Sequence, residues 1–545
     1  MKRIFLILLI SVFLTTCAPA ATSSALPMST STVPSATITP TTTPVPEDWW
    51  DKAVFYEIFV RSFFDSNGNG VGDFNGITEK LDYLKNLGIN AIWLMPIHPS
   101  PTYHGYDVID YFKVNPDYGT MDDFKRLLSE AHKRDIRIII DLVLNHTSSQ
   151  NPWFVDANAN PQSPYRNWFI WSETDQGYSG PLGQAWHPGL HGFYYGIFGG
   201  NMPDLNYKNP DVTTMMEKIV HFWLDDIGID GFRLDAVKYL IEEGQKQENT
   251  KSTHDWLKNF YLAYKADKAD AYTVGEVFGA GAFIAKTYTG NQMDEIFSFE
   301  LASGFVNSAA GEANSGVNSG FQFTLKDMPE GPYGTFLTNH DQNRVMSVLN
   351  GNVEKAKVAA TLLLTSPGTP FIYYGEEIGM EGQKPDEQIR RPMQWTAGIN
   401  AGFTTGTPWE ALDPDYSVSN VASELSDPNS LLSYYQTLLE LRSRYPALHE
   451  PGTELLSSNN RGIFAVLRHS QNEIILVLVN LTKTTISDYS LKVKDTSLQD
   501  GPYHLSSLLG TEKPVDLNIA GGSNNNYTPL PELSPFSSHV FLIEP

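Results

Sequence analysis

Side chains able to do chemistry lie at the C-terminal ends of several short apolar runs of this 545-residue chain. A lone carboxylate in such a place is more often structural than functional. Burying several charged groups together is costly unless they are paired, so a cluster of them indicates a chemical task. The residues concerned are Asp141, Asn145, His146, Arg233, Asp235, Glu276, His340 and Asp341.

Two carboxyl groups of unequal acidity would suit cleavage of a glycosidic bond. That reaction needs one carboxylate to attack the anomeric carbon and one protonated acid to release the leaving oxygen, and retaining enzymes hold the two about 5–5.5 Å apart. Asp235 follows Arg233 closely, and a guanidinium can keep a neighbouring carboxylate ionised. Glu276 ends an apolar run near other carboxylates, a setting that raises the pKa of a general acid.

The apolar runs themselves predict the strands of a parallel sheet. Amphipathic segments such as 76–88 and 121–135 separate them, and continuous apolar strands alternating with helices are typical of parallel sheets. Eight such units predict a closed barrel, whose reaction centre lies at the C-terminal ends of its strands. The runs cover residues 53–60, 90–96, 136–146, 229–237, 271–278, 293–300, 334–341 and 370–377.

Two segments break this rhythm. Residues 147–209 are rich in Gly, Pro, Trp and Tyr and too long for an ordinary loop, which predicts a small inserted domain B. From residue 449 short alternating strands predict an antiparallel sandwich. The expected class is therefore α/β, a (β/α)₈ TIM barrel with an insert after the third strand and a C-terminal β-sandwich. The barrel, domain A, would comprise 47–146 and 210–448, and domain C would comprise 449–545.

The N-terminus predicts export. Basic residues precede an apolar stretch, 4–14, that is too short to span a membrane comfortably. Cys17 follows it in a pattern similar to a bacterial lipobox, although Thr16 is unusual there, so ordinary secretion is the alternative to a lipid anchor. Residues 18–46, almost entirely Ser, Thr, Pro and Ala, predict a disordered linker after the 1–17 signal. We expect an extracytoplasmic protein anchored at a bacterial cell surface or facing the periplasm.

The composition narrows the partners. The chain has 38 basic and 62 acidic residues, a net charge of −24. This balance argues against nucleic acid and anionic membrane surfaces as partners. One cysteine excludes a disulfide within the chain. Membrane contact is expected only through the lipid anchor, and the protein is expected to be a monomer.

The residues after four strands resemble known motifs. DLVLNH (141–146), GFRLDAVKY (231–239), GEVF (275–278) and FLTNHD (336–341) resemble the four motifs of glycoside hydrolase family 13, the α-amylase family. MPDLN (202–206) resembles its fifth motif. Their order and spacing also agree, and the resemblance extends over nearly everything from residue 49 onward.

This resemblance implies roles for individual residues. Asp235 would be the nucleophile, Glu276 the acid/base and Asp341 the stabiliser of the transition state. Tyr106, in YHGYD (103–107), would stack on the sugar at the cleavage point. The whole set implied to bind an α-glucan substrate is His104, Tyr106, His146, Arg233, Lys238 and His340.

The motifs resemble two branches of the family. Ala236 stands where relatives that cut α-1,6 bonds typically carry Val, and Lys238 matches a leaving-group lysine of α-amylases. MPDLN and RRPMQW (390–395) resemble oligosaccharide-cutting relatives instead. We expect cleavage of α-1,4 bonds in starch-like glucans and malto-oligosaccharides through a covalent glycosyl-enzyme. An α-glucosidase or transglycosylase on short glucans is the main alternative, and a non-catalytic glucan-binding lipoprotein is disfavoured because all three carboxylates are present.

A loop after the first strand predicts a Ca²⁺ site. In DSNGNGVGD (65–73) oxygen ligands alternate with glycines, as in calcium loops, although Gly76 excludes an EF-hand and a plain Asn-Gly turn is the alternative. The ligands would be Asp65, Asn67, Asn69, the Val71 carbonyl and Asp73. The resemblance also suggests a second Ca²⁺ between Asn145 and Asp204, which Tyr239, in place of a usual histidine, puts in doubt.

Overall fold

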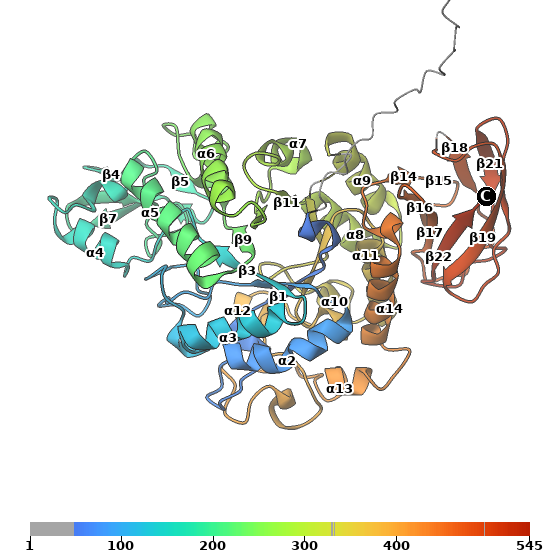
Figure 1. Ribbon diagram of the computed structural model, residues 1–545, viewed down its shortest axis with the longest axis horizontal. Coiled ribbons are helices and arrows are strands. Elements are labelled where there is room, and N and C mark those ends of the chain that lie inside the picture. Colours follow the sequence, from blue (N-terminus) through green and yellow to red (C-terminus); the bar gives the residue numbers. More distant parts are fainter. Residues whose placement is uncertain (1–47, 329–330, 332, 495) are drawn as a thin grey trace, which may run out of the picture. The chain divides into compact units, whose positions relative to one another are not determined.

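The computed structural model describes residues 48–328, 331, 333–494 and 496–545. Within them, parallel strands close into a barrel in which each strand pairs with its neighbours along the chain (Figure 1). All eight predicted strands and the predicted fold class are confirmed. The strands are β1 (Phe55–Ile58), β2 (Ala91–Leu94), β3 (Arg137–Leu142), β9 (Gly231–Leu234), β10 (Tyr272–Gly275), β11 (Glu295–Phe297), β12 (Tyr333–Phe336) and β13 (Thr369–Tyr373).

The barrel is filled by its own side chains. Alternate residues of a strand point to opposite faces, so every strand contributes to an inner and an outer core. Large inward residues such as Trp93 and Phe371 are buried together in the inner cluster. Phe55 stacks on Phe371 with ring centroids 4.4 Å apart. The interior is therefore a packed core, and ligands can reach only its ends.

Helices surround the strands and begin where the sequence provides capping groups. The predicted helices at 76–88 and 121–135 appear as α2 (Phe74–Leu87) and α3 (Met121–His132). The Asp73 side chain accepts from the Gly76 amide at the start of α2, and Thr120 caps α3. Such caps each contribute about 1 kcal/mol. The other long helices are α5 (Pro210–His221), α6 (Lys251–Asp267), α8 (Phe299–Gly311), α9 (Ser315–Asp327), α11 (Val353–Leu364) and α14 (Leu431–Arg444).

The chain between β3 and α5 forms small elements of its own. After α4 (Pro152–Ala159) come short antiparallel strands that pair in two sheets, ordered β4-β8-β7 and β5-β6. Trp186 and Tyr195 pack there with centroids 5.4 Å apart, within a separate aromatic cluster. These strands are β4 (Trp171–Ser172), β5 (Ser179–Gly180), β6 (Gly183–Gln184), β7 (Trp186–Gly189) and β8 (Gly192–Tyr195).

The C-terminal part contains two antiparallel sheets with a core between them. In Figure 1 these strands gather around the C-terminus. The six-stranded sheet is ordered β14-β16-β17-β22-β19-β20 and the three-stranded sheet β15-β18-β21. They comprise β14 (Thr453–Leu455), β15 (Ser457–Ser458), β16 (Ile463–His469), β17 (Ile474–Asn480), β18 (Leu491–Lys494), β19 (Gly501–Leu509), β20 (Leu517–Ile519), β21 (Ser523–Tyr527) and β22 (Ser538–Glu544).

The larger sheet also packs against the barrel helices. Phe464 of β16 stacks on Phe321 of α9 with centroids 5.6 Å apart. The Asn314 side chain, at the start of α9, donates to the Ile463 carbonyl at 2.8 Å. Residues 48–545 accordingly form one compact unit, and the boundaries of domains A, B and C stay predictions.

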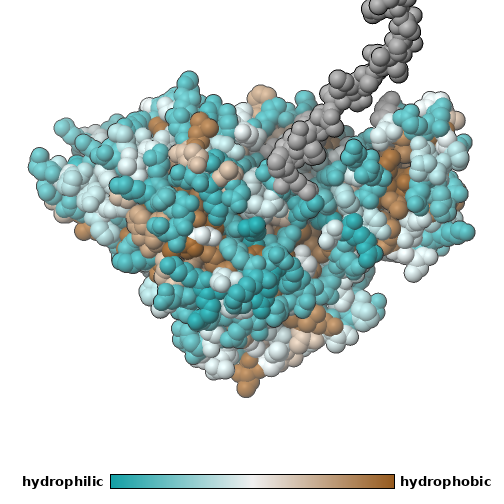
Figure 2. Space-filling view, viewed as in Figure 1, coloured by the Kyte–Doolittle hydropathy of each residue, from teal (hydrophilic) through white to brown (hydrophobic). Residues whose placement is uncertain are grey.

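The predicted export signal 1–17, Cys17 and the linker 18–46 lie outside the described residues. Among the helices that the structure describes, none is both long and apolar enough to cross a bilayer. The face shown in Figure 2 is mostly hydrophilic, with apolar residues exposed in small patches.

Candidate active site

A single buried guanidinium organises the carboxylates at the C-terminal end of the barrel. Arg233 Nη1 lies 2.9 Å from Asp141 and 2.6 Å from Asp235, and its Nη2 lies 2.6 Å from Glu276. Asp141 and Arg233 are opposite each other in the pairing of β3 with β9. Three adjacent strands therefore deliver their carboxylates to one cation, which offsets the cost of burying them.

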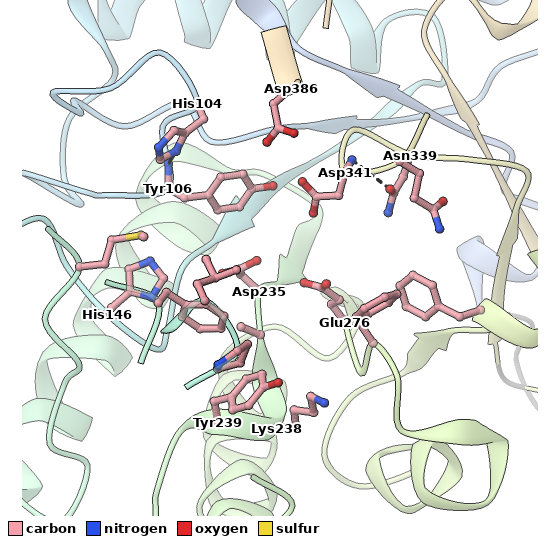
Figure 3. A pocket seen from close by; sticks show the side chains of 18 of the residues that line it. His104, Tyr106, His146, Asp235, Lys238, Tyr239, Glu276, Asn339, Asp341 and Asp386 are labelled. Carbon is pink, nitrogen blue, oxygen red and sulfur yellow. Dashed lines mark hydrogen bonds between the residues drawn. The ribbon is translucent and has the colours of Figure 1, made fainter. Parts of the chain in front are cut away.

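Backbone pairing continues just beyond these strands and fixes the positions of Asp235 and Glu276, the two residues expected to react. The Asp235 amide donates to Leu142 O at 3.2 Å, and the Glu276 amide donates to Leu234 O at 3.1 Å. Both side chains line a pocket of about 600 Å³. In Figure 3 the carboxyl groups of Asp235, Glu276 and Asp341 face one shared space. Because each of the first two contacts Arg233, their carboxyl groups lie close together.

The electrostatics of the pocket separate the roles of its carboxyl groups. Burial raises the pKa of Glu276 to about 7, and the nearby charges of Asp235 and Asp341 add to this while Arg233 opposes it. This is the direction expected of a general acid. Burial also acts to raise the pKa of Asp341, but His340 and Arg390 outweigh it, so the net shift is downward and this group stays ionised.

His340 lies beneath the pocket in a chain of hydrogen bonds. Its Nδ1 is 2.5 Å from the carboxylate of Glu57, and its Nε2 is 2.6 Å from the Tyr106 hydroxyl. That hydroxyl donates in turn to Asp141 at 3.1 Å. Burial lowers the pKa of His340, but Asp341 and Glu57 raise it further, so the net shift is upward and favours the imidazolium.

The structure brings most of the predicted substrate-binding residues to the pocket. The residues His104, Tyr106, His146 and Lys238 line it. Arg233 and His340 lie behind it, where Arg233 contacts Asp235 and His340 contacts Tyr106. Lys238 pairs with Glu248 at 2.6 Å and lies 4.8 Å from the centre of the Tyr239 ring.

Several functional residues escaped prediction. Arg390 donates to Asp341 at 3.0 Å. The sequence indicated this residue only as the first member of the RRPMQW segment and gave it no role. Glu57 had a weaker signal, as the one charge inside the first apolar run. Phe278 and Asn339 also line the pocket, although the sequence marked them only as members of the GEVF and FLTNHD motifs. No motif included the remaining lining residues Leu182, Phe299, Gln342, Lys384 and Asp386.

The oxygen ligands of loop 65–73 fit a hard cation. Asp65 and Asp73 are buried, and Asn67 and Asn69 lie between them. The Asp65 carboxylate accepts backbone amides of Asn67, Gly68 and Gly70, so the loop folds back around it. Carboxylate, amide and carbonyl oxygens at such spacing are what Ca²⁺ prefers.

The structure also brings Asn145 and Asp204 together. Leu205 N donates to Asn145 O at 2.9 Å, and the Asn145 side chain acts to lower the pKa of Asp204, so the side chains of Asn145 and Asp204 lie close together. Among the described residues, Asn145 Oδ1 is buried without a donor. Burial raises the pKa of Asp204 well above its usual value. An oxygen lacking a partner beside a poorly solvated carboxyl group fits a cation at this point as well.

Comparisons with known proteins agree with this geometry. A model of the α-amylase catalytic domain matches residues 57–451. The chain is 43% identical over 445 residues to α-amylase 3 of Dictyoglomus thermophilum, covering 80% of this chain and 86% of that protein. It is 36% identical over 523 residues to an oligo-1,6-glucosidase of Heyndrickxia coagulans, covering 81% and 93%.

A solved structure extends the likeness to three dimensions. The crystal structure of the α-amylase from H. orenii matches with a TM-score of 0.79 at 37% identity, covering 90% of this chain and 99% of that chain. Relatives of both kinds confirm the intermediate resemblance that the motifs indicated. The chain therefore belongs to the α-amylase family of glycoside hydrolases and is an enzyme of that family.

Proposed function

We propose that this enzyme hydrolyses α-1,4-glucosidic bonds in starch-like glucans and malto-oligosaccharides with retention of configuration. The observation that carries the proposal is the pair Asp235 and Glu276, both held by Arg233 in one pocket. Retention requires two carboxyl groups close enough for one of them to attack the sugar directly. A guanidinium that binds both of them supports such closeness.

In the first step Asp235 attacks the anomeric carbon while Glu276 gives its proton to the glycosidic oxygen. The bond to that oxygen breaks, the shortened glucan leaves with the proton, and the sugar stays on Asp235 as an ester. Arg233, whose Nη1 lies 2.6 Å from the Asp235 carboxylate, holds that carboxylate in place for the attack. Asp341, anionic beside Arg390, stabilises the positive charge that develops on the sugar ring.

In the second step Glu276, now ionised, takes a proton from water as that water attacks the anomeric carbon. The ester bond to Asp235 breaks, and both carboxyl groups return to their starting states. Tyr106 is positioned by His340 to stack on the sugar throughout, since its ring lies parallel to the imidazole at a centroid distance of 5.7 Å.

The α-1,4 preference rests on Ala236 and Lys238, both of which line the pocket. Lys238, fixed by Glu248, could bind a leaving sugar next to Glu276. An α-glucosidase or transglycosylase is the second candidate. It is favoured by the RRPMQW segment, whose Arg390 lies in the pocket, and by the relative named oligo-1,6-glucosidase.

We further propose Ca²⁺ bound by Asp65, Asn67, Asn69, the Val71 carbonyl and Asp73. The loop joins the short helix α1 (Val60–Phe63), which follows β1, to the start of α2, and no proposed reacting group lies on it. A Ca²⁺ there would supply structural stability rather than chemistry. A second Ca²⁺ at Asn145 and Asp204 would tie the segment before α5 to the end of β3.

Product analysis tests the function. Purified enzyme is incubated with amylose, pullulan and maltotriose, and Asp235→Asn serves as the inactive control, because an amide is a very poor nucleophile. Internal cuts that give a range of malto-oligosaccharides from amylose are expected. Release of glucose alone would favour the α-glucosidase, and unimpaired hydrolysis by Asp235→Asn would contradict the mechanism.

Location is a separate proposal. The basic and apolar N-terminus and Cys17 support an enzyme exported from a bacterial cell and lipid-anchored outside the cytoplasm. Metabolic labelling with a radioactive fatty acid, in the full chain and in Cys17→Ser, tests it. Equal labelling of the two proteins would contradict the anchor.

A further inference from the structure

A second groove continues from the catalytic pocket. It measures about 590 Å³ and lies between the segment after β10 and the helices α8 and α9. Phe278 and Phe299 line both the pocket and the groove. Their rings meet edge to face with centroids 5.0 Å apart, and Phe336 supports Phe299 from the barrel at 5.2 Å. The two hollows therefore share one aromatic wall.

Glycines shape the floor of this groove. A side chain on Gly304 would meet the Gly316 carbonyl at 2.9 Å, and one on Gly320 would meet the Glu300 carbonyl at 3.0 Å. The helices α8 and α9 thus approach each other too closely for larger residues. Since no side chain rises from these positions, the floor stays open and is made rigid by helix packing.

The walls offer aromatic faces and hydroxyl or amide groups. Phe278 and Phe323 are each 58% exposed, and both line the same groove, so two apolar rings are available there to a ligand. Ser303, Asn307 and Ser319 are exposed along the same groove. Among the described residues that line it, Glu300 alone is charged. Apolar rings beside uncharged hydrogen-bonding groups fit a neutral polyhydroxy chain, whose sugar rings present apolar faces and hydroxyl edges.

Continuity with the pocket sets the direction of that chain. Phe278 follows Glu276 by two residues, and Glu276 is the group that protonates the departing sugar. Glu276 and Phe278 line the same pocket, and Phe278 also lines the groove, so the groove opens beside the group that protonates the departing sugar. We propose that the groove binds the leaving-group portion of a longer α-glucan, with Phe323 on its far wall as a stacking platform. This inference rests on the proposed function and assigns it a preference for long chains.

Phe323→Ala tests the groove because the ring is exposed and touches none of the reacting groups. We expect kcat/KM for maltoheptaose to fall roughly threefold to tenfold, the scale of one aromatic contact. The value for maltotriose, too short to occupy the pocket and the whole groove, should be unchanged. Leu262→Ala is the matched control, since this apolar residue on α6 is 64% exposed and lines neither hollow.

Binding measurements separate this inference from the proposed function. In the Asp235→Asn background, calorimetry with maltoheptaose and maltotriose should show that Phe323→Ala weakens only the longer ligand. Equal affinities with and without Phe323, or an equal loss on both ligands, would overturn the groove. A wild-type enzyme that cleaves no α-1,4-glucan would instead overturn the proposed function, whatever Phe323→Ala does to binding.

Discussion

Glu57 offers the sharpest test of how the reaction centre is held together. Its carboxylate lies 2.5 Å from His340 Nδ1, and both groups are buried. Glu57→Gln keeps the size of the side chain and removes its charge. Burial then acts on His340 with less opposition, since Asp341 remains but the charge of Glu57 is gone, so the pKa of His340 should fall and the imidazole should lose its proton more readily.

The size of the effect follows from the loss of one charge-assisted contact. Hydrogen bonds to charged groups contribute about 1.5–3 kcal/mol, and about 1.4 kcal/mol corresponds to tenfold, so the protonated form should become roughly 10- to 100-fold less favoured. A neutral His340 no longer donates from both nitrogens, which disturbs Tyr106 and weakens the field that keeps Asp341 ionised.

The assay is kcat/KM against pH on a malto-oligosaccharide. In the wild type, loss of the Glu276 proton should limit activity on the alkaline side near pH 7. In Glu57→Gln, His340 should lose its proton before Glu276 does. The alkaline loss of activity should therefore begin at a lower pH than in the wild type, and acidification should partly restore activity.

Glu295→Gln is the matched control for a buried carboxyl group. Glu295 is also buried, on β11, but it contacts Tyr272 and Thr369 at the opposite end of the barrel. This variant should lose stability and keep the wild-type pH profile. The reasoning fails if Glu57→Gln retains both the wild-type kcat/KM and the wild-type alkaline limb.

Three further predictions concern the acid, the metal and the linkage. Glu276→Gln should lose starch cleavage yet still form the glycosyl-enzyme from α-glucosyl fluoride, whose leaving group needs no proton; equal losses would contradict the acid role. Chelation of Ca²⁺ should lower the melting temperature of the wild type while the folded enzyme keeps most of its turnover. In Asp65→Ala the melting temperature should be the same with and without chelator, and an unchanged melting temperature in the wild type would refute the site. Ala236→Val should lower the ratio of maltotriose to isomaltose cleavage, by a factor that corresponds to roughly 1–3 kcal/mol. It should also destabilise the fold, because Ala236 has φ 49° and a β-branched residue is strained there; a rise in the ratio would refute the steric argument.

The barrel and its central carboxylates could be predicted because their signals are local. Each strand belongs to a short apolar run, and Asp235 and Glu276 lie at the C-terminal ends of two of these runs. Glu57 could not be assigned, since its partner His340 is 283 residues away and only barrel closure brings them together. The groove was equally hidden. Gly304 and Gly316 look like ordinary glycines until two helices are seen to pack through them.

The stacking of Phe321 on Phe464 limits how far this enzyme can be shortened. Phe321 lies two residues before Phe323 on α9, and Asn314 ties the start of that helix to β16. A truncated chain ending near residue 448 would leave Phe321 facing water and the helix without its tether. Exchange of C-terminal domains between relatives should therefore disturb α9 and the position of Phe323, and the sandwich is best treated in engineering as part of the catalytic unit.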